Sequence, residues 1–500
     1  MKRLYLYGPP ASGKTTRALA LARRFKVKAV DLDEAIVAKI GMPIARYFAE
    51  KGEAAFRQLE AETLREVDAD IVALGGGTLL KDENRAYAEE HGFVAVLDAD
   101  EQTLAARIAA QQGLRPLGDM FAKRRAHYAS FPHHVTDETQ IVLPSSLAGS
   151  VAVPVSKSHL HRLLIADFLA TGAHEVLPAL PGDCADIAAT RRCLAALAAR
   201  EEVLDCGESG STLRFLAPVA AALGVKARFI RHGRLAERPM LDFSHLAAGR
   251  HVLRGDISSQ FVSGLLFALP LLDKPSCIVF STPLESRGYV AMTCDVLRRY
   301  GIKIVPEPDG FTVPAPQTYR RAEGAVLAPE GDWSGAAFWF AANVLGADVT
   351  PTNLCATSLQ PDRAVCELVP RVKQGGAEID ISPCPDLFPA LAVTAAATPA
   401  GTRFVNAARL RLKESDRIAA MQRVLNALGV ANEATADTVT VHGTAGTFAA
   451  CEIDAQNDHR IAMAAAVAAL RAEGPVLIQA ARCVAKSYPD FFDAYASLIV

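Results

Sequence analysis

The chain has 500 residues, more than one hydrophobic core can organise, so we expect two to four domains. Half of the residues are apolar and 22% are charged, which is typical of an ordered globular chain and excludes a disordered one. A formal net charge of −2 excludes a general attraction to nucleic acid or anionic membranes. We therefore expect small-molecule partners, and any anion must be bound by locally placed Arg and Lys.

Targeting and cysteine signals are also weak. No run of 18 apolar residues occurs, and the apolar start is too short for a signal peptide, so we predict a cytoplasmic protein without a membrane partner. The ten cysteines follow position 183 without a CxxC pair, which favours reduced, mostly buried thiols over disulfides or a zinc site. A nucleophilic role for Cys184, Cys206 or Cys384 is the less favoured alternative.

The first region alternates predicted strands and helices. Strands are predicted at residues 3–7, 27–32, 71–74 and 93–97, with a helix at 15–25 and further helical windows between them. This alternation favours an α/β fold with a parallel sheet covered by helices. We predict that this domain spans residues 1–138.

The segment GPPASGKT, between the first strand and the first helix, fits the P-loop pattern G-x-x-x-x-G-K-[ST]. Glycines allow backbone amides to face a phosphate, Lys14 reaches the outer phosphates, and Thr15 can ligate Mg²⁺. A turn without a ligand is the alternative. The predicted ATP-binding residues are Gly8, Pro10, Ala11, Ser12, Gly13, Lys14, Thr15 and Thr16.

Two carboxylates end the second predicted strand in the sequence DLD. In a parallel sheet they would lie next to the P-loop, where one carboxylate can hold Mg²⁺ through water and the other can accept a substrate hydroxyl. We assign the metal to Asp31 together with Thr15. An aspartate at this position is also often only a helix N-cap.

These motifs, with GEAAFRQLE at 52–60, GGG at 75–77 and RPL at 115–117, resemble shikimate kinase over residues 1 to about 135. The resemblance implies ATP-dependent phosphorylation of shikimate, with Lys14 and Asp33 catalytic and Mg²⁺ as cofactor. It also implies that Arg115 closes over the ATP phosphates, and that Arg124, preferred to Arg125 by its distance to Tyr128, binds shikimate. The implied shikimate-binding residues are Asp33, Arg57, Gly76, Gly77 and Arg124.

The pattern changes after a polar stretch at 133–140. From about 141 to 500, helix–strand–strand patterns recur in roughly six units, which indicates internal duplication. Basic residues recur there in compact polar motifs, and burying so many cations implies a strongly anionic ligand. For the segment PVSKSHLHR alone, an N-cap serine with exposed basic neighbours is the alternative. The recurring cations are Lys157, Arg162, Arg214, Arg238, Arg417, Arg460 and Lys486.

Carboxylates accompany these cations. Asp386, Glu414 and Asp458 lie in the same motifs, and two acids with different neighbours can supply a base and an acid in one site. In isolation, Glu414 is equally well explained as a helix salt-bridge partner.

The series PVSKSHLHR, GESGSTLR, ERP, SSQF, SRGY, EGDWSGA, PDLFPA, LKESDR, NDHRIAM and AKSYPD resembles 5-enolpyruvylshikimate-3-phosphate (EPSP) synthase over residues 141–500. The resemblance implies two lobes, each of three βαβαββ units, with the site in the cleft. Lobe one would comprise about 141–155 and 331–500, and lobe two 156–330.

The resemblance also implies residue roles. Asp386 would act on the 5-hydroxyl and Glu414 on the methylene carbon, while Lys157 and Lys486 stabilise developing charge, without a cofactor. Shikimate 3-phosphate would be bound by Lys157, Ser158, Arg162, Ser258, Ser259, Gln260, Ser286, Tyr289, Asp386 and Lys413. Phosphoenolpyruvate would be bound by Lys157, Gly210, Arg238, Gln260, Arg417, Arg460 and Lys486. Glu208 and Arg409 depart from the amides common at these positions.

Together the two resemblances predict a bifunctional enzyme of the shikimate pathway of aromatic amino-acid biosynthesis. One alternative is an EPSP synthase carrying a catalytically silent or differently specific P-loop module. Another is a nucleotide or sugar kinase fused to a UDP-N-acetylglucosamine enolpyruvyl transferase, which the SSQF, SRGY and LKESDR motifs disfavour.

Overall fold

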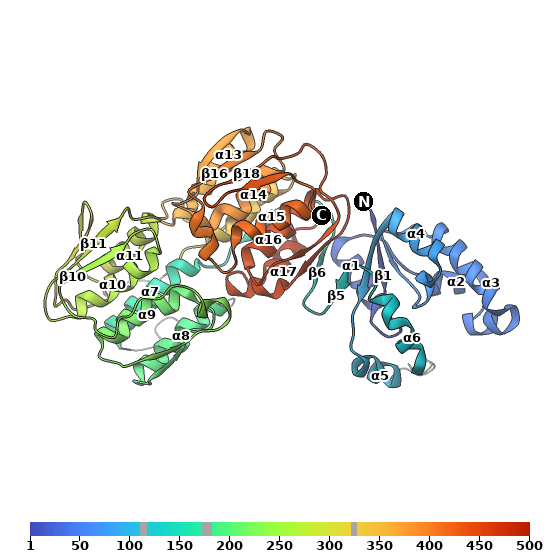
Figure 1. Ribbon diagram of the computed structural model, residues 1–500, viewed down its shortest axis with the longest axis horizontal. Coiled ribbons are helices and arrows are strands. Elements are labelled where there is room, and N and C mark those ends of the chain that lie inside the picture. The colour runs from blue at the N-terminus through green and yellow to red at the C-terminus, as the bar shows by residue number, and fades with distance from the viewer. Residues whose placement is uncertain (111–117, 173–182, 322–327) are drawn as a thin grey trace.

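A computed structural model describes residues 1–110, 118–172, 183–321 and 328–500. The chain forms three bodies in a row (Figure 1), with the N-terminal body at one end and two larger bodies beside it. No helix in these described ranges is long and apolar enough to span a bilayer.

The N-terminal body has a five-stranded sheet in the order β2-β3-β1-β4-β5, and all of its strand pairs are parallel. The predicted parallel sheet is confirmed; β5 was not predicted, because two residues carry no periodic signal. The strands are β1 (Arg3–Tyr7), β2 (Ala29–Asp31), β3 (Ile71–Ala73), β4 (Gly92–Leu97) and β5 (His134–Val135). The helices are α1 (Lys14–Phe25), α2 (Leu32–Ile40), α3 (Ile44–Glu66), α4 (Asp82–His91), α5 (Glu101–Ala110) and α6 (Gly118–Tyr128).

The central body, which we call lobe one, packs three small sheets around helices. Its strands are β6 (Gln140–Val142), β7 (Ala148–Ala152), β14 (Asp348–Thr352), β15 (Ala377–Asp380), β16 (Thr402–Val405), β17 (Asn432–Ala434), β18 (Val439–Val441), β19 (Cys451–Asp454) and β20 (Val476–Gln479). Its helices are α12 (Trp333–Val344), α13 (Val365–Gln374), α14 (Phe388–Ala396), α15 (Arg417–Ala427), α16 (His459–Ala468) and α17 (Phe491–Ser497).

The remaining body, lobe two, contains the segment of chain between β7 and α12. Its strands are β8 (Val203–Asp205), β9 (Arg228–Ile230), β10 (Arg250–Arg254), β11 (Ser276–Thr282), β12 (Val305–Glu307) and β13 (Gly310–Val313). Its helices are α7 (Lys157–Thr171), α8 (Ala185–Ala198), α9 (Gly210–Ala222), α10 (Ser259–Ala268) and α11 (Arg287–Arg299).

Internal duplication is visible in the strand order. The succession β10-α10-β11-α11-β12-β13 in lobe two repeats as β15-α14-β16-α15-β17-β18 in lobe one. Each forms a sheet with one parallel pair followed by two antiparallel pairs. These are two complete βαβαββ units, one in each lobe.

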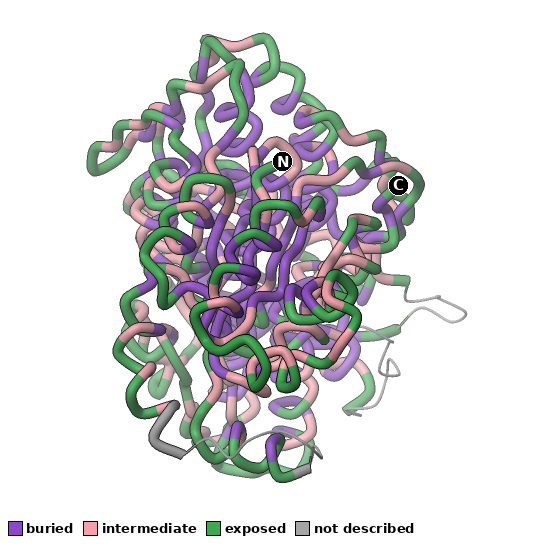
Figure 2. Tube along the Cα trace, turned by 90° about the vertical axis from the view of Figure 1, so that its right-hand side faces the viewer, coloured by how far each residue is buried: buried purple, intermediate pink, exposed green. Residues whose placement is uncertain are grey.

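Buried residues lie in the interior of the molecule, and exposed ones at its periphery (Figure 2). Lobe two has its own apolar core, whereas the core of lobe one continues into the N-terminal body through α1 and one face of the β1–β4 sheet. Polar contacts follow the same junction: Lys26 Nζ donates to the Ile499 carbonyl (2.6 Å), and Lys2 pairs with Glu473 (2.7 Å). The N-terminal body is therefore packed against lobe one.

Candidate active sites

The P-loop lies between β1 and α1, as predicted. Gly13 precedes α1 with a left-handed φ of 92°, and Lys14 is the first helical residue. Lys14 Nζ donates to the carbonyls of Gly8 (3.1 Å) and Pro9 (2.7 Å). Burial lowers the pKa of Lys14 to about 8, despite Asp33 and Asp31. No carboxylate of the described residues forms an ion pair with this ammonium, as expected of a group that meets a phosphate.

The DLD carboxylates lie beside the P-loop. Asp31 accepts a hydrogen bond from the Thr15 hydroxyl and also caps α2 through the amides of Asp33 (2.9 Å) and Glu34 (3.3 Å). Asp31 is therefore a helix N-cap, as the alternative interpretation predicted, and it also contacts Thr15. Burial, with Asp31 and Glu60 nearby, raises the pKa of Asp33 to about 6, so Asp33 is a stronger proton acceptor than an ordinary aspartate.

A second group of side chains converges on the GGG turn. Arg124 donates to the Gly76 carbonyl (3.2 Å), and the backbone of Gly77 lies against the guanidinium groups of Arg57 and Arg124. Glu60, only 2% exposed, holds Arg57 at 2.7 Å. Two guanidinium groups at one turn form a carboxylate-binding surface.

One cavity is lined by the P-loop, the DLD carboxylates and part of the glycine turn. Its lining contains Pro10, Ala11, Ser12, Gly13, Lys14, Thr15, Thr16, Asp31, Asp33 and Gly76, but not Gly8, Arg57, Gly77 or Arg124. Arg125 lines this cavity as well, whereas Arg124 donates to the Gly76 carbonyl of the glycine turn. Arg107 of α5, which sequence reasoning missed, lies 3.4 Å from the Ala11 carbonyl. Arg115 falls outside the described residues.

The second site lies between lobes one and two. Ser156 caps α7, so the predicted cations Lys157 and Arg162 occur in its first two turns. Lys157 pairs with Asp186 at 2.8 Å, and Arg162 donates to Thr293, to the Ser158 carbonyl and to the Tyr289 carbonyl. Asp186 was not predicted because no motif marks it.

The cavity at this interface has lining from both lobes. It contains the predicted residues Lys157, Ser158, Arg162, Gly210, Arg238, Ser258, Ser259, Gln260, Ser286, Tyr289, Asp386, Lys413 and Glu414. The predicted residues Arg417, Arg460 and Lys486 are not part of this lining.

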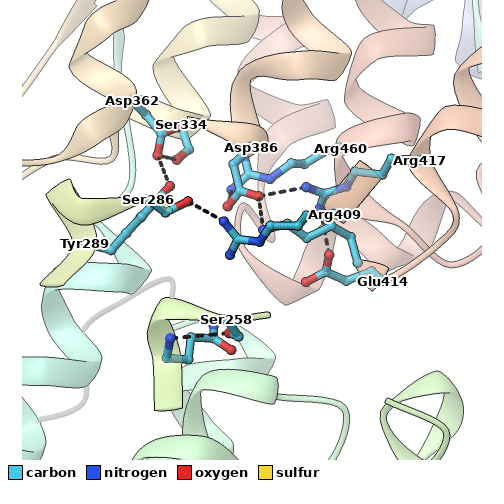
Figure 3. A network of polar contacts seen from close by, with 12 residues as sticks. Ser258, Ser286, Tyr289, Ser334, Asp362, Asp386, Arg409, Glu414, Arg417 and Arg460 are labelled. Carbon is cyan, nitrogen blue, oxygen red and sulfur yellow. Dashed lines mark hydrogen bonds and ion pairs between the residues drawn. The ribbon is translucent and has the colours of Figure 1, made fainter. Parts of the chain in front are cut away.

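Arg409 connects the two lobes at this cavity. It comes from lobe one, and its Nη1 donates to Ser286 Oγ of lobe two at 2.9 Å and contacts Glu285 at 3.0 Å (Figure 3). Ser258 caps α10 on the opposite wall, and the two serines face a common space. The sequence marked Arg409 only as a departure from a common amide.

Asp386 forms the centre of a charged cluster in lobe one (Figure 3). Lys413 approaches it at 3.1 Å, Arg417 at 2.8 Å and Arg460 at 3.0 Å. Burial alone would raise the pKa of Asp386, but these cations outweigh burial and hold the pKa well below its usual range. The carboxylate is therefore ionised.

Arg417 links this carboxylate to two others. Its side chain is 1% exposed and also contacts Glu414 and Asp458, each at 2.8 Å. Burial opposes ionisation of Glu414, but the cations Arg417, Arg238 and Lys157 and the nearby His459 keep its pKa well below the usual range. Asp386 and Glu414 thus share one arginine, although only Glu414 and Arg417 belong to the same motif, LKESDR.

Two further cations, Arg214 and Arg238, lie at the start of α9 and line the same cavity. A Cβ on Gly210 would lie 3.0 Å from Arg214 and 3.1 Å from Arg238, so only glycine leaves both guanidinium groups against this backbone. Arg214 is buried, and burial lowers its pKa to about 9. A helix N-terminus with two guanidinium groups is an anion-binding surface.

Comparisons with known proteins agree with this arrangement. Residues 241–495 match the family described as EPSP synthase (3-phosphoshikimate 1-carboxyvinyltransferase), and residues 10–140 match shikimate kinase. A 3-phosphoshikimate 1-carboxyvinyltransferase of Clostridium kluyveri is 35% identical, covering 71% of this chain and 96% of that protein. The Clostridium acetobutylicum protein is 36% identical over 70% and 94%. The solved EPSP synthase of Acinetobacter baumannii is similar in fold, with a TM-score of 0.56 at 21% identity over 72% of this chain and 98% of that one.

Proposed function

Since the chain belongs to the EPSP synthase family and carries a shikimate kinase region before it, we propose that one polypeptide performs two consecutive reactions. ATP phosphorylates the 3-hydroxyl of shikimate, and the enolpyruvyl group of phosphoenolpyruvate is then transferred to the 5-hydroxyl. We assign the kinase to residues 1–138 and the transferase to 141–500, with lobe one at 141–155 and 331–500 and lobe two at 156–330.

The kinase proposal is supported by the P-loop and the arginine pair beside the glycine turn. Lys14 would neutralise the outer phosphates, and Arg57 and Arg124 would hold the shikimate carboxylate. Asp33, whose pKa is about 6, would accept a hydrogen bond from the attacking hydroxyl.

Magnesium fits the oxygen atoms beside the P-loop. The Thr15 hydroxyl and the Asp31 carboxylate are hard oxygen donors in direct contact, which is the chemistry that Mg²⁺ prefers. These two residues would hold the ion. When bound, it would neutralise charge on the transferring phosphate.

The transferase proposal depends most on one observation, the meeting of Asp386 and Glu414 with cations of both lobes. Asp386 would take the proton of the 5-hydroxyl as its oxygen bonds to C2 of phosphoenolpyruvate. Glu414, ionised in the free protein, would take up a proton from solvent when the anionic substrate raises its pKa, and would give that proton to C3. In the second step C3 returns a proton to Glu414, the C2–O bond to phosphate breaks, and phosphate leaves with the proton held by Asp386. The carboxylate of phosphoenolpyruvate would share Arg417 and Arg460 with Asp386, which would make Asp386 more basic.

Separable sites give a direct test. Lys14→Ala should lower shikimate phosphorylation at least about a hundredfold and leave the transferase unchanged, because the hydrogen bonds of Lys14 to described residues lie within the P-loop. Glu414→Ala should have the reverse effect. Each activity is measured separately, the transferase with supplied shikimate 3-phosphate. Loss of both activities from either substitution would contradict the proposal, and an intact transferase beside an inactive wild-type kinase would favour a silent P-loop module.

A further inference from the structure

Glu208 connects the two lobes at the edge of the transferase cleft. It lies in the turn before α9 of lobe two, and its partners belong to lobe one: Asn457, just before α16, and Lys486, the last residue of the 3₁₀ helix Ala481–Lys486. Sequence reasoning marked this glutamate only as a departure from an amide.

The three residues form a closed set of contacts. Lys486 Nζ donates to Glu208 Oε2 at 2.8 Å and to the Asn457 carbonyl at 2.7 Å. Asn457 Nδ2 lies 3.1 Å and 3.0 Å from the two carboxylate oxygens of Glu208. The ammonium group has three protons, and two of them have acceptors among the residues that the structure describes.

The local backbone confines the carboxylate to this position. A Cβ on Gly233 would lie 2.9 Å from Glu208 Cδ, so the neighbouring chain lies directly against the carboxylate. Asn457 has a left-handed φ of 56°; its side-chain amide donates to Glu208, and its carbonyl accepts from Lys486. The side chains of Lys486 and Glu208 are 11% and 32% exposed, so water screens the pair only in part.

The same turn also carries Gly210, and the guanidinium groups of Arg214 and Arg238 lie against its backbone. Glu208 thus joins Lys486 of lobe one to the Gly210 turn of lobe two, and both Lys486 and Gly210 are proposed to bind phosphoenolpyruvate. We propose that Glu208 is a positioning residue of the transferase: it touches no substrate, and it holds the Lys486 ammonium at the anion site while it keeps the lobes closed there. This inference rests on the proposed transferase function.

The test uses the full-length protein with shikimate 3-phosphate and varied phosphoenolpyruvate, following phosphate release. Glu208→Ala should raise the KM for phosphoenolpyruvate about fivefold or more, the effect expected of residues in direct contact. Glu208 contacts Lys486, which is assigned to phosphoenolpyruvate and not to shikimate 3-phosphate. The KM for shikimate 3-phosphate should therefore change less than about twofold, because substitutions affect distant sites only weakly. Glu208→Gln, which keeps an acceptor for Lys486, should restore part of the loss. Glu201→Gln, an exposed glutamate of the same lobe, is the matched control.

A double-substitution cycle makes the test specific to Lys486. In a Lys486→Met background, adding Glu208→Ala should leave the KM for phosphoenolpyruvate unchanged. Independent, multiplying effects would overturn the inference, and so would an unchanged KM in Glu208→Ala. An equal rise in both KM values, together with a loss of kinase activity, would show a folding defect and would also overturn the inference. A wild-type protein inactive on shikimate 3-phosphate would instead refute the proposed function.

Discussion

His161 shows how a single buried residue affects stability at the transferase cleft. It lies on α7 between Lys157 and Arg162, is fully buried, and its Nδ1 lies 2.7 Å from the Thr190 hydroxyl. Burial first, and then the charges of Lys157 and Arg162, lower its pKa well below the usual value. The imidazole is therefore neutral in the folded protein.

This neutral histidine predicts a loss of stability in mild acid. The unfolded chain binds a proton at His161 below about pH 6.5, and the folded chain does not, so the stability present above that pH falls as pH decreases. One such group contributes up to about 1.4 kcal/mol per pH unit. Urea unfolding of His161→Gln, followed by circular dichroism at pH 7 and pH 5.5, should show a smaller pH dependence than wild type.

His442→Gln is the control for this experiment, because His442 is exposed and its partner, Glu433, is exposed as well. Its pH dependence should equal that of wild type. Equal slopes for wild type and His161→Gln would contradict the account of a buried neutral histidine.

The residue scale also shows what sequence reasoning can find. Lys14, Asp386 and Arg417 were found because each belongs to a compact motif whose spacing reflects one local geometry. Asp186 and Arg107 were missed, because they reach the sites through tertiary packing and no local pattern marks them. The pairing of Glu208 with Lys486 joins positions 278 residues apart, so a single sequence cannot reveal it.

Helix α1 illustrates the same limit for a secondary-structure element. Its apolar periodicity predicted the helix and a buried face, but not what covers that face. Leu21 and Phe25 belong to the apolar cluster that continues into lobe one, and Arg24 donates to the Phe492 carbonyl of α17. The helix that begins at the ATP site therefore also forms part of the junction with the transferase.

Shortening Phe25 should consequently destabilise this shared core. Phe25→Ala removes a side chain that is 4% exposed, and we expect a loss of about 3–5 kcal/mol in the unfolding of the N-terminal body together with lobe one. Calorimetry should show that transition at lower temperature, with lobe two unchanged because its core is separate. Leu19→Ala, on the same helix but 48% exposed, is the control and should change little. If the unfolding transition of the N-terminal body moved to lower temperature while that of lobe one did not, the result would contradict a shared core.

At the scale of the whole molecule, the short connector after β5 contributes to both halves. Arg17 of α1 donates to the Thr139 carbonyl at 2.7 Å, and the Thr139 hydroxyl donates to Gln479 of β20. The connector also lines the P-loop cavity. The two families were predictable from their motifs, whereas this junction was not, because it depends on packing between segments more than 300 residues apart.

The central claim is that one chain performs both reactions in sequence. The most direct measurement incubates the purified protein with shikimate, ATP, Mg²⁺ and phosphoenolpyruvate, and follows each product by mass spectrometry. We predict that shikimate 3-phosphate appears first and that its enolpyruvyl product follows, with neither formed when ATP is omitted. Conversion of added shikimate 3-phosphate without any phosphorylation of shikimate would contradict the claim.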